Sequence, residues 1–196
     1  MSTLVGKEAP GFKTKAVLAN KIISAFSLEP YLGKNVILFF YPLDFTFVCP
    51  TELHAFEEKR QEFEQRNCQL IGCSVDSAFT HLAWLNTPRE KGGIAGISYP
   101  LISDLTKSIS KDYGVLIPEE GIAYRGLFLI DKAGIVRHQV INDLPLGRSV
   151  DEAIRILDAL TFFEENGEVC PANWKQGAKS MKPTQNGLEE YFAIRK

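Results

Sequence analysis

The sequence lacks several features that would assign it to a common class of protein. Its four cysteines are too few for a disulfide-stapled secreted module, and no two of them form a C-x-x-C motif. The missing motif argues against a thioredoxin-like disulfide reductase, whose two thiols would lie one helical turn apart. The three histidines, His54, His81 and His138, are not spaced as metal-ligand pairs with one another or with the cysteines, so a zinc site has little support.

Charge and hydropathy exclude further classes. The 196 residues include 22 basic and 24 acidic side chains, mixed along the chain, and the formal net charge is −2, so there is no basic stripe to hold nucleic acid. No run approaches the roughly 20 apolar residues of a membrane-spanning helix, and residues 1–18 lack the apolar stretch of a signal peptide. We therefore expect a cytoplasmic protein without nucleic-acid or membrane partners, in which any disulfide is transient.

The chain contains enough apolar residues to form one sizeable core, and these residues occur in short runs. Four of these runs have the pattern of strands, and the first two are nearly continuous, as in buried central strands: residues 35–41, 69–75, 126–131 and 135–141. Residues 50–67 carry apolar side chains at helical spacing, which predicts a strand–helix–strand crossover between the first two strands. A turn at 131–134 predicts a hairpin between the last two strands, so we expect an α/β fold with a mixed sheet flanked by helices.

Two further helices are predicted, over residues 104–114 and 149–167, and each ends at a glycine. The remaining residues are rich in Gly, Pro and Lys and show little periodicity before a last short segment. The sequence therefore predicts one domain over residues 1–167 and a C-terminal extension over residues 168–196.

Cys49 stands at the predicted junction of a strand and a helix. It directly precedes Pro50, and proline is favoured in the first turn of a helix because its missing N–H costs nothing there. A cysteine at a helix N-terminus faces unpaired N–H groups and the positive end of the helix dipole, which stabilise the reactive thiolate. The alternative is a buried cysteine that acts as a small hydrophobe. The position at a helix start favours a nucleophile.

The residues just before Cys49 are expected to shape its surroundings. Phe45, Phe47 and Val48 are apolar and should exclude water, which strengthens the effect of fixed dipoles on the sulfur. Thr46 offers a hydroxyl to a charged or polar partner.

Cys170 repeats this local pattern, since it also precedes a proline, but it lies in the irregular extension, where solvent access is expected. Such a thiol can resolve an oxidised partner thiol, and the alternative is an incidental exposed cysteine. Cys68 and Cys73 lie in or beside the predicted strand at 69–75. Because buried thiols in apolar surroundings are inert, we predict a structural role for both.

Six segments together resemble the typical 2-Cys peroxiredoxins, the thioredoxin-fold peroxidases that include bacterial alkyl hydroperoxide reductase subunits: FYPLDFTFVCPTE, GCSVDS, DLTKSISKDYGVL, RGLFLIDKAGIVRH, NDLPLGRS and GEVCPANWKQG. They run in order over nearly the whole chain. The resemblance implies a thioredoxin-like fold, a peroxidatic Cys49 whose pocket is completed by Pro42, Thr46 and Arg125, and a resolving Cys170 supplied by a neighbouring subunit. It also implies a homodimer, commonly assembled as a ring of five dimers.

The chemistry of peroxide reduction fits these residues. A thiolate attacks one peroxide oxygen while negative charge builds on the other, so the site needs cationic or N–H donors that face the leaving oxygen. Arg125 carries a fixed fork of donors that suits this task, although without the resemblance it would be taken for a solvated side chain. We also expect Arg148 and Glu52 to form an ion pair that orients Arg125, and His54 to be a surface side chain.

The expected reaction cycle couples chemistry to local unfolding. Attack on hydrogen peroxide or an organic hydroperoxide leaves Cys49 as a sulfenic acid, which Cys170 converts to a disulfide. Because Cys49 begins a helix in a packed domain, the first turn of that helix must unwind. An external dithiol, thioredoxin-like or flavoprotein-linked, then reduces the disulfide, and no cofactor is expected because no segment resembles a flavin or nicotinamide site.

Two interpretations from other classes remain open at this point. One is a holdase-type chaperone or redox-sensing binding protein that captures unfolded chains on exposed apolar surface and uses its cysteines only as switches. The other is a cysteine hydrolase, which needs a histidine beside Cys49.

Two short segments bear on sensitivity to excess peroxide. GGIAG at 92–96 partly resembles the Gly-Gly-Leu-Gly loop of easily overoxidised peroxiredoxins, but Ile94 and Ala95 stand where the pattern has Leu and Gly. The Tyr191–Phe192 pair resembles the terminal motif of the same proteins, and ordinary aromatic packing of a last helix explains it equally well.

Overall fold

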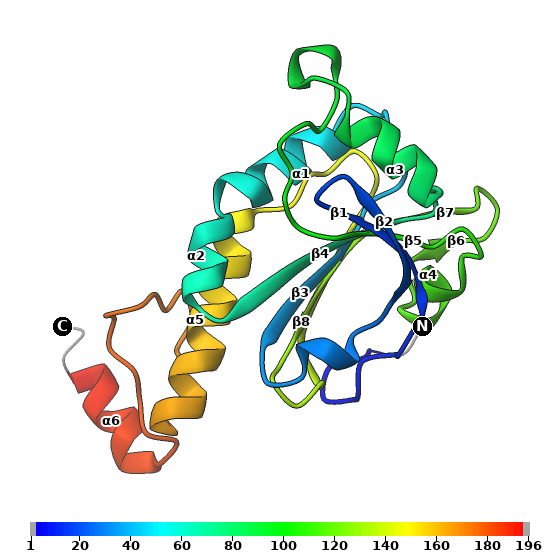
Figure 1. Ribbon diagram of the computed structural model, residues 1–196. Helices are drawn as coiled ribbons and strands as arrows, with labels where there is room; N and C mark the ends of the chain where they lie inside the picture. The colour runs from blue at the N-terminus through cyan, green and yellow to red at the C-terminus, as the bar shows by residue number, and fades with distance from the viewer. Residues whose placement is uncertain (1–2, 194–196) are drawn as a thin grey trace. The chain divides into compact units, whose positions relative to one another are not determined.

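The computed structural model describes residues 3–193, and the path of the chain can be followed in Figure 1. The described part forms two compact units, which divide between Val150 and Asp151. The division at residue 167 that the sequence suggests stays a prediction. No helix among the described residues is long and apolar enough to cross a membrane.

The first unit, in the part that is described, is built on a seven-stranded sheet in the order β2-β1-β5-β4-β3-β8-β9. Strands β3, β4 and β5 are parallel to one another, whereas β8, β9, β1 and β2 each run antiparallel to a neighbour. Their bounds are β1 Thr14–Leu18, β2 Lys21–Phe26, β3 Asn35–Phe40, β4 Cys68–Ser74, β5 Leu101–Ser103, β8 Arg125–Ile130 and β9 Val136–Asn142. The mixed sheet confirms the expected fold class, and each of the four predicted strands lies within one residue of an observed one.

Strand β3 is an interior strand that lies between β4 and β8, and all six of its residues are buried. On one face of the sheet Phe40 meets Tyr113 and Phe128 in the main apolar cluster. On the other face Phe39 stacks on Phe56 with ring centroids 4.3 Å apart. The near-continuous apolar run thus covers both faces of one strand, as expected for a strand between two layers.

Helices cover both faces of this sheet. The side that carries Phe56 holds α1 (Cys49–Glu58), α2 (Arg60–Gln65) and α3 (Ala78–Leu85), and the opposite side holds the short α4 (Ser108–Asp112). The single helix predicted over 50–67 is observed as two helices, α1 and α2. Lys59 separates them, because its backbone angles, φ −99° and ψ 3°, are not helical. The helix predicted over 104–114 is shorter because Asp104 lies before it and accepts from the amides of Ile109 and Ser110.

The smaller elements connect these layers. They are the 3-10 turns η1 (Glu29–Tyr31) and η2 (Arg89–Lys91) and the two-stranded sheet of β6 (Leu116–Ile117) and β7 (Ile122–Ala123). The predicted hairpin at 131–134 is confirmed, since β8 pairs antiparallel with β9 and Gly134 has a φ of +83° at the turn. Glycine adopts that left-handed conformation without strain.

The antiparallel pairing of β3 with β8 determines where the site forms. Val36 lies opposite Ile130 and Phe39 lies opposite Leu127, so the start of β8 is beside the end of β3. The chain leaves β3 for the loop that leads to Cys49, while Arg125 is the first residue of β8. Two segments that are far apart in the sequence therefore meet at one end of the sheet.

The second unit contains α5 (Val150–Asn166) and α6 (Gln185–Ala193). Helix α5 confirms the prediction for 149–167, and it is followed by Gly167, where φ is +66°. Between the two helices a β-bridge joins Val169 to Met181, and the buried Trp174 ring packs 4.9 Å from that of Phe162. The last predicted segment is part of α6, and its residues 194–196 lie outside the described part of the chain.

Candidate active site

Cys49 is the first residue of α1, as the sequence predicts, and Pro50 occupies the first turn. Its side chain is 0% exposed. Burial alone would also fit a cysteine that serves as a small hydrophobe, so the surrounding charges decide what this sulfur can do.

Arg125 provides the decisive contact. Its guanidinium Nη1 lies 3.4 Å from Cys49 Sγ, and its Nε donates to the carbonyl oxygen of Leu144 at 2.6 Å. The residue is 3% exposed. Arg125 therefore places a positive charge in direct contact with the buried sulfur at the N-terminus of α1.

Glu52 connects Arg125 to Arg148. Its carboxylate accepts from Arg125 Nη1 at 2.8 Å, and it accepts from the Nε, Nη2 and backbone amide of Arg148 at 2.8, 3.0 and 2.8 Å. Arg148 also donates to the carbonyl of Phe40, which fixes it to the end of β3. The ion pair expected from the sequence is present, and it positions Arg125 on one side of the cysteine.

The charges in this buried cluster do not balance without the sulfur. Two guanidinium groups face one carboxylate, and the side chains of Arg125, Arg148 and Glu52 are all almost fully buried. The buried cluster therefore places a net positive charge beside the Cys49 sulfur.

Pro42 and Thr46 lie in the loop that joins β3 to α1. Pro42 is buried, and the Thr46 hydroxyl donates to the carbonyl oxygen of Leu43 at 2.9 Å, which leaves its lone pairs to accept a bond from a bound molecule. The expectation that Phe45 and Phe47 exclude water from the thiol is wrong for this chain, because they are 52% and 92% exposed. Their side chains turn outward, and Phe45 has a positive φ of +55°.

The other three cysteines differ from Cys49. All four lie in the described part of the chain and are free thiols. Burial raises the pKa of Cys68 to about 12 and raises the pKa of Cys73 well above its usual value, which agrees with the structural role predicted for both. Cys170 is half-buried, its Sγ is 3.6 Å from the carbonyl oxygen of Ala159, and burial raises its pKa although Arg155 opposes that shift.

His54 and His81 do not take part in the thiol site. The prediction that His54 is a surface side chain is wrong: it is 8% exposed, and its Nε2 lies 3.1 Å from the carbonyl oxygen of Gly93. His81 is fully buried, with Nδ1 2.7 Å from an Asp44 carboxylate oxygen. Each of these rings is thus engaged elsewhere, so neither forms the cysteine–histidine pair that a cysteine hydrolase requires.

Sequence reasoning missed two features that support the site. The first is the carbonyl oxygen of Leu144, which accepts from Arg125 and orients it. This contact could not be predicted, because every residue has a backbone carbonyl and the residue type does not show which one a side chain will meet. Asp44 accepts from Tyr41 at 2.9 Å and pairs with His81, which fixes the loop between Pro42 and Thr46. The signal for the second feature was present, since an aspartate and a histidine inside apolar segments are each expected to need a partner.

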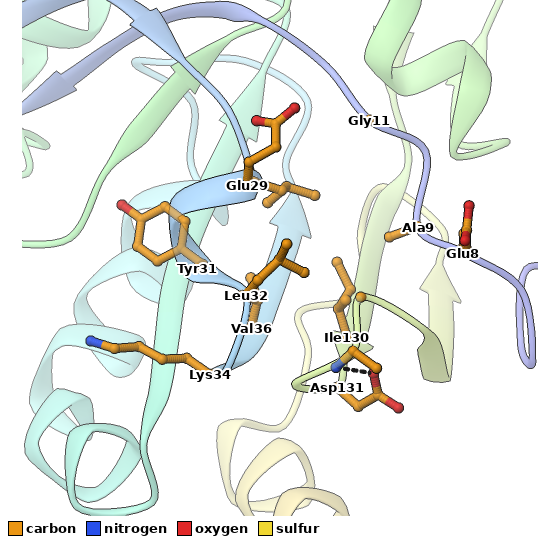
Figure 2. A pocket seen from close by; sticks show the side chains of 13 residues that line it. Glu8, Ala9, Gly11, Glu29, Tyr31, Leu32, Lys34, Val36, Ile130 and Asp131 are labelled. Carbon is orange, nitrogen blue, oxygen red and sulfur yellow. Dashed lines mark hydrogen bonds between the residues drawn. The ribbon is translucent and has the colours of Figure 1, made fainter.

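A separate cavity of about 300 Å³ lies at the opposite end of β3 (Figure 2). Figure 2 shows Glu29, Tyr31 and Leu32 on one side of it, facing Ile130, Asp131 and Ala9 on the other. None of its lining residues is a cysteine or a histidine, and the buried Asp131 carboxylate is already bonded to the amides of residues 133 and 135 and to Arg137. This cavity is therefore separate from Cys49, which follows the other end of β3.

Comparisons with known proteins agree with this geometry. Residues 5–139 match the AhpC/TSA family, and residues 159–193, which include Cys170, match the C-terminal domain of 1-Cys peroxiredoxin. The chain belongs to the AhpC/TSA family of peroxiredoxins. Members of this family are thiol-dependent peroxidases, so the resemblance stated from the sequence is confirmed and the binding-protein interpretation is not favoured.

Individual relatives cover almost the whole chain. The 2-Cys peroxiredoxin BAS1, chloroplastic, of Hordeum vulgare is 57% identical over 97% of this chain and 90% of its own length. Thioredoxin peroxidase of Echinococcus granulosus is 53% identical over 98% of this chain and 100% of its own length. The reduced 2-Cys peroxiredoxin of Plasmodium vivax has a TM-score of 0.95 and 51% identity, and the match covers 98% of this chain and 100% of the other. This peroxiredoxin therefore has the expected thioredoxin-like fold.

Proposed function

We propose that this protein, a thiol-dependent peroxidase by its family, reduces hydrogen peroxide and organic hydroperoxides with Cys49 as the attacking thiol and Cys170 of a neighbouring subunit as the resolving thiol. The observation that carries the proposal is the 3.4 Å approach of Arg125 to the Cys49 sulfur inside a buried cluster with surplus positive charge. The position of Cys49 at the start of α1 supports it further.

The first step is a nucleophilic displacement. The Cys49 thiolate attacks one peroxide oxygen, the O–O bond breaks, and the other oxygen leaves as hydroxide or alkoxide and takes up a proton. Cys49 is thereby oxidised to a sulfenic acid. Arg125 donates to the sulfur and to the leaving oxygen, while Pro42 and Thr46 form the wall that holds the peroxide. Glu52 and Arg148 keep the guanidinium in place.

The second step joins the two cysteines. The Cys170 thiolate attacks the Cys49 sulfur, water leaves, and a disulfide forms. Because Cys49 is fully buried in α1, the first turn of that helix has to unwind before another thiol can reach the sulfur. A thioredoxin-like or flavoprotein-linked dithiol then supplies two electrons and two protons by thiol–disulfide exchange. No cofactor takes part. The proposed compartment is the cytoplasm, where thiols are kept reduced.

We propose a homodimer assembled as a ring of five dimers, and two exposed apolar surfaces are available for the self-contacts that such an assembly needs. Strand β9 is the last strand of the sheet and exposes Val140 and Ile141, and an edge strand of this kind pairs readily with a second copy. A second surface exposes Phe79 of α3 and Phe45, whose ring lies 5.7 Å from that of Trp84 in the same helix. Two different self-contacts are needed to close dimers into a ring.

A single-turnover experiment tests the thiol assignments. Hydrogen peroxide is mixed with the reduced protein in stopped flow, and oxidation is followed by tryptophan fluorescence. We expect Cys49→Ser to abolish the reaction, and Cys170→Ser to keep one rapid oxidation but lose turnover with a dithiol. Rapid oxidation that survives in Cys49→Ser overturns the proposal.

A further inference from the structure

The segment that carries Cys170 is fastened to helix α5 at both of its ends. The Cys170 Sγ lies 3.6 Å from the carbonyl oxygen of Ala159, and because a carbonyl can only accept, the thiol S–H is the donor in this contact. Four residues further on, the backbone carbonyl of Trp174 accepts from Arg155 Nη1 at 3.1 Å. We call residues 170–174 the Cys170 loop. Helix α5 thus holds the first residue of this loop through Ala159 and the last through Arg155.

The Cys170 loop has a defined shape. Its turn is closed by the Trp174 amide, which donates to the carbonyl oxygen of Pro171 at 3.0 Å, and the Trp174 ring is 3% exposed and packs against Phe162 of α5. Arg155 and Ala159 are four residues apart in the same helix and therefore share one face of it. The thiol accordingly lies about one helical turn from Arg155.

The Arg155 guanidinium is itself fixed by a carboxylate. Its Nε and Nη2 donate to the two carboxylate oxygens of Glu152 at 2.7 and 2.8 Å. These bonds raise the pKa of Arg155, so the guanidinium keeps its charge at neutral pH. Because the donors of a guanidinium lie in one rigid plane, two of them hold Glu152 while a third reaches the Trp174 carbonyl. Arg155 therefore connects a surface carboxylate to the Cys170 loop.

Two influences act on the pKa of the Cys170 thiol. Burial raises this pKa, and the positive charge of Arg155 lowers it. The interaction is also seen from the other partner, since the charge of Cys170 raises the pKa of Arg155. Two further charged side chains of the second unit are engaged elsewhere: Glu168 accepts from the Ser180 hydroxyl, and Lys179 donates to the backbone carbonyl of residue 190. Arg155 is therefore the charge that opposes the effect of burial on Cys170.

We propose that Arg155 is the positioning residue of the resolving thiol: it fastens the Cys170 loop to α5 and holds a positive charge where it favours the thiolate of Cys170. In the attack on oxidised Cys49 that thiolate forms the S–S bond, the S–O bond of the sulfenic acid breaks, and the hydroxide that leaves takes up a proton to become water. Glu152 sets the strength of the effect, because its negative charge offsets part of the charge of the guanidinium. The inference rests on the proposed function for the role of Cys170.

Alkylation of the reduced protein tests the charge effect without any peroxide. The protein is treated with iodoacetamide over a series of pH values, and labelling of the Cys170 peptide is followed by mass spectrometry. Because the thiolate is the nucleophile, the pH midpoint reports ionisation of Cys170 and the plateau at high pH reports access to it. Arg155→Gln keeps a polar amide but removes the cation. We expect its midpoint to lie at higher pH than that of the wild type, with labelling at neutral pH slowed severalfold.

A variant of opposite sign separates charge from structure. Glu152→Gln removes the negative charge but keeps an amide oxygen that accepts from Arg155, so its midpoint should move to lower pH. A residue that only holds the loop in place would give the same direction of change in both glutamine variants. Arg155→Lys keeps the charge but lacks the rigid fork, and it should recover part of the midpoint shift. Lys179→Gln is the matched control, since it removes a positive charge from the same unit and should leave the midpoint unchanged.

The functional arm follows disulfide formation. Peroxide is mixed with the reduced protein in stopped flow, where oxidation of Cys49 gives a first phase and formation of the disulfide gives a second. Trp174 lies within the Cys170 loop, so its fluorescence reports the second phase directly. We expect the pH midpoint of the second phase to shift upward in Arg155→Gln and downward in Glu152→Gln. The rate of the first phase should stay unchanged in both variants.

Three results would overturn the role of Arg155. They are an alkylation midpoint of Arg155→Gln equal to that of the wild type, midpoints of Arg155→Gln and Glu152→Gln that move in the same direction, and a shift in Lys179→Gln as large as that in Arg155→Gln. The proposed function fails in a different way. If Cys170→Ser still turns over with a dithiol, Cys170 is not the resolving thiol, while the alkylation midpoints still report the charge of Arg155 on its sulfur.

Discussion

Arg125 and Cys49 are 76 positions apart in the sequence, yet the guanidinium Nη1 of the first lies 3.4 Å from the sulfur of the second. The contact exists because β8 runs antiparallel to β3 and begins where β3 ends. A cation at the start of one strand thereby meets a thiol that follows the other.

Arg125 is expected to act through its charge and its geometry. Arg125→Met keeps most of the apolar stem but removes the cation, so oxidation of Cys49 should slow by orders of magnitude. Arg125→Lys should recover only part of the loss, because one ammonium group cannot span sulfur and leaving oxygen as the guanidinium does. The measurement is the second-order oxidation rate across pH, with the melting temperature as a control for folding. A folded Arg125→Met protein that reacts at the wild-type rate would show that this arginine is outside the site.

Cys170 is expected to form a disulfide between chains. Nonreducing electrophoresis after one equivalent of peroxide should show a covalent dimer in the wild type and only monomer in Cys170→Ala, because the resolving thiol comes from a neighbouring subunit. Cys68→Ala serves as the control, since its thiol is buried and should not matter for the cross-link. If both thiols disappear while the band stays monomeric, the bridge lies within one chain.

The pair of His81 and Asp44 should contribute strongly to stability. Both side chains are fully buried and are 2.7 Å apart, so His81→Ala leaves the Asp44 carboxyl group with an unpaired polar face inside the protein. Breaking such a pair typically costs about 3 kcal/mol of unfolding free energy. Urea unfolding at neutral pH measures the change, and His138→Ala, at a half-buried position on β9, provides the comparison. Equal losses in the two variants would contradict the prediction.

Cys68 should make the protein less stable at alkaline pH. Burial raises the folded-state pKa of this thiol from 9.0 to about 12, so the folded protein keeps a proton that the unfolded chain releases. The contribution of this protonated thiol to the free energy of unfolding is therefore fully present below pH 9.0, and it is lost as the pH rises toward about 12. One unit above the unfolded pKa the loss is about 1.4 kcal/mol.

Cys68→Ala tests this alkaline effect. Urea unfolding of the wild type and of the variant is compared at neutral pH and at about pH 10, one unit above the unfolded pKa. The variant should lose less stability than the wild type over this range, because it has no thiol to ionise on unfolding. Parallel losses in the two proteins would show that ionisation of Cys68 is not linked to unfolding.

Local patterns in the sequence were sufficient for the elements that carry the thiol. The apolar run before Pro42 gave β3, and the Cys49–Pro50 pair gave the start of α1, because strand periodicity and proline at a helix start are properties of neighbouring residues. Local patterns did not predict the surroundings of a side chain when its neighbours in space are distant in the sequence. Phe45 and Phe47 are apolar and were expected to cover the thiol, but they point outward, and His54 was expected at the surface but is buried.

By itself, the sequence determined the α/β class, the four strands predicted from their apolar runs, the helix start at Cys49 and the inert surroundings of Cys68 and Cys73. Each of these depends on residue type and spacing over a few positions. The family resemblance already suggested Arg125 near Cys49 and a pair of Glu52 with Arg148, but only the tertiary structure decided the contacts themselves and the pairing of Asp44 with His81. These contacts join residues that are tens of positions apart, and strand order and direction bring them together, which no local pattern of side chains encodes.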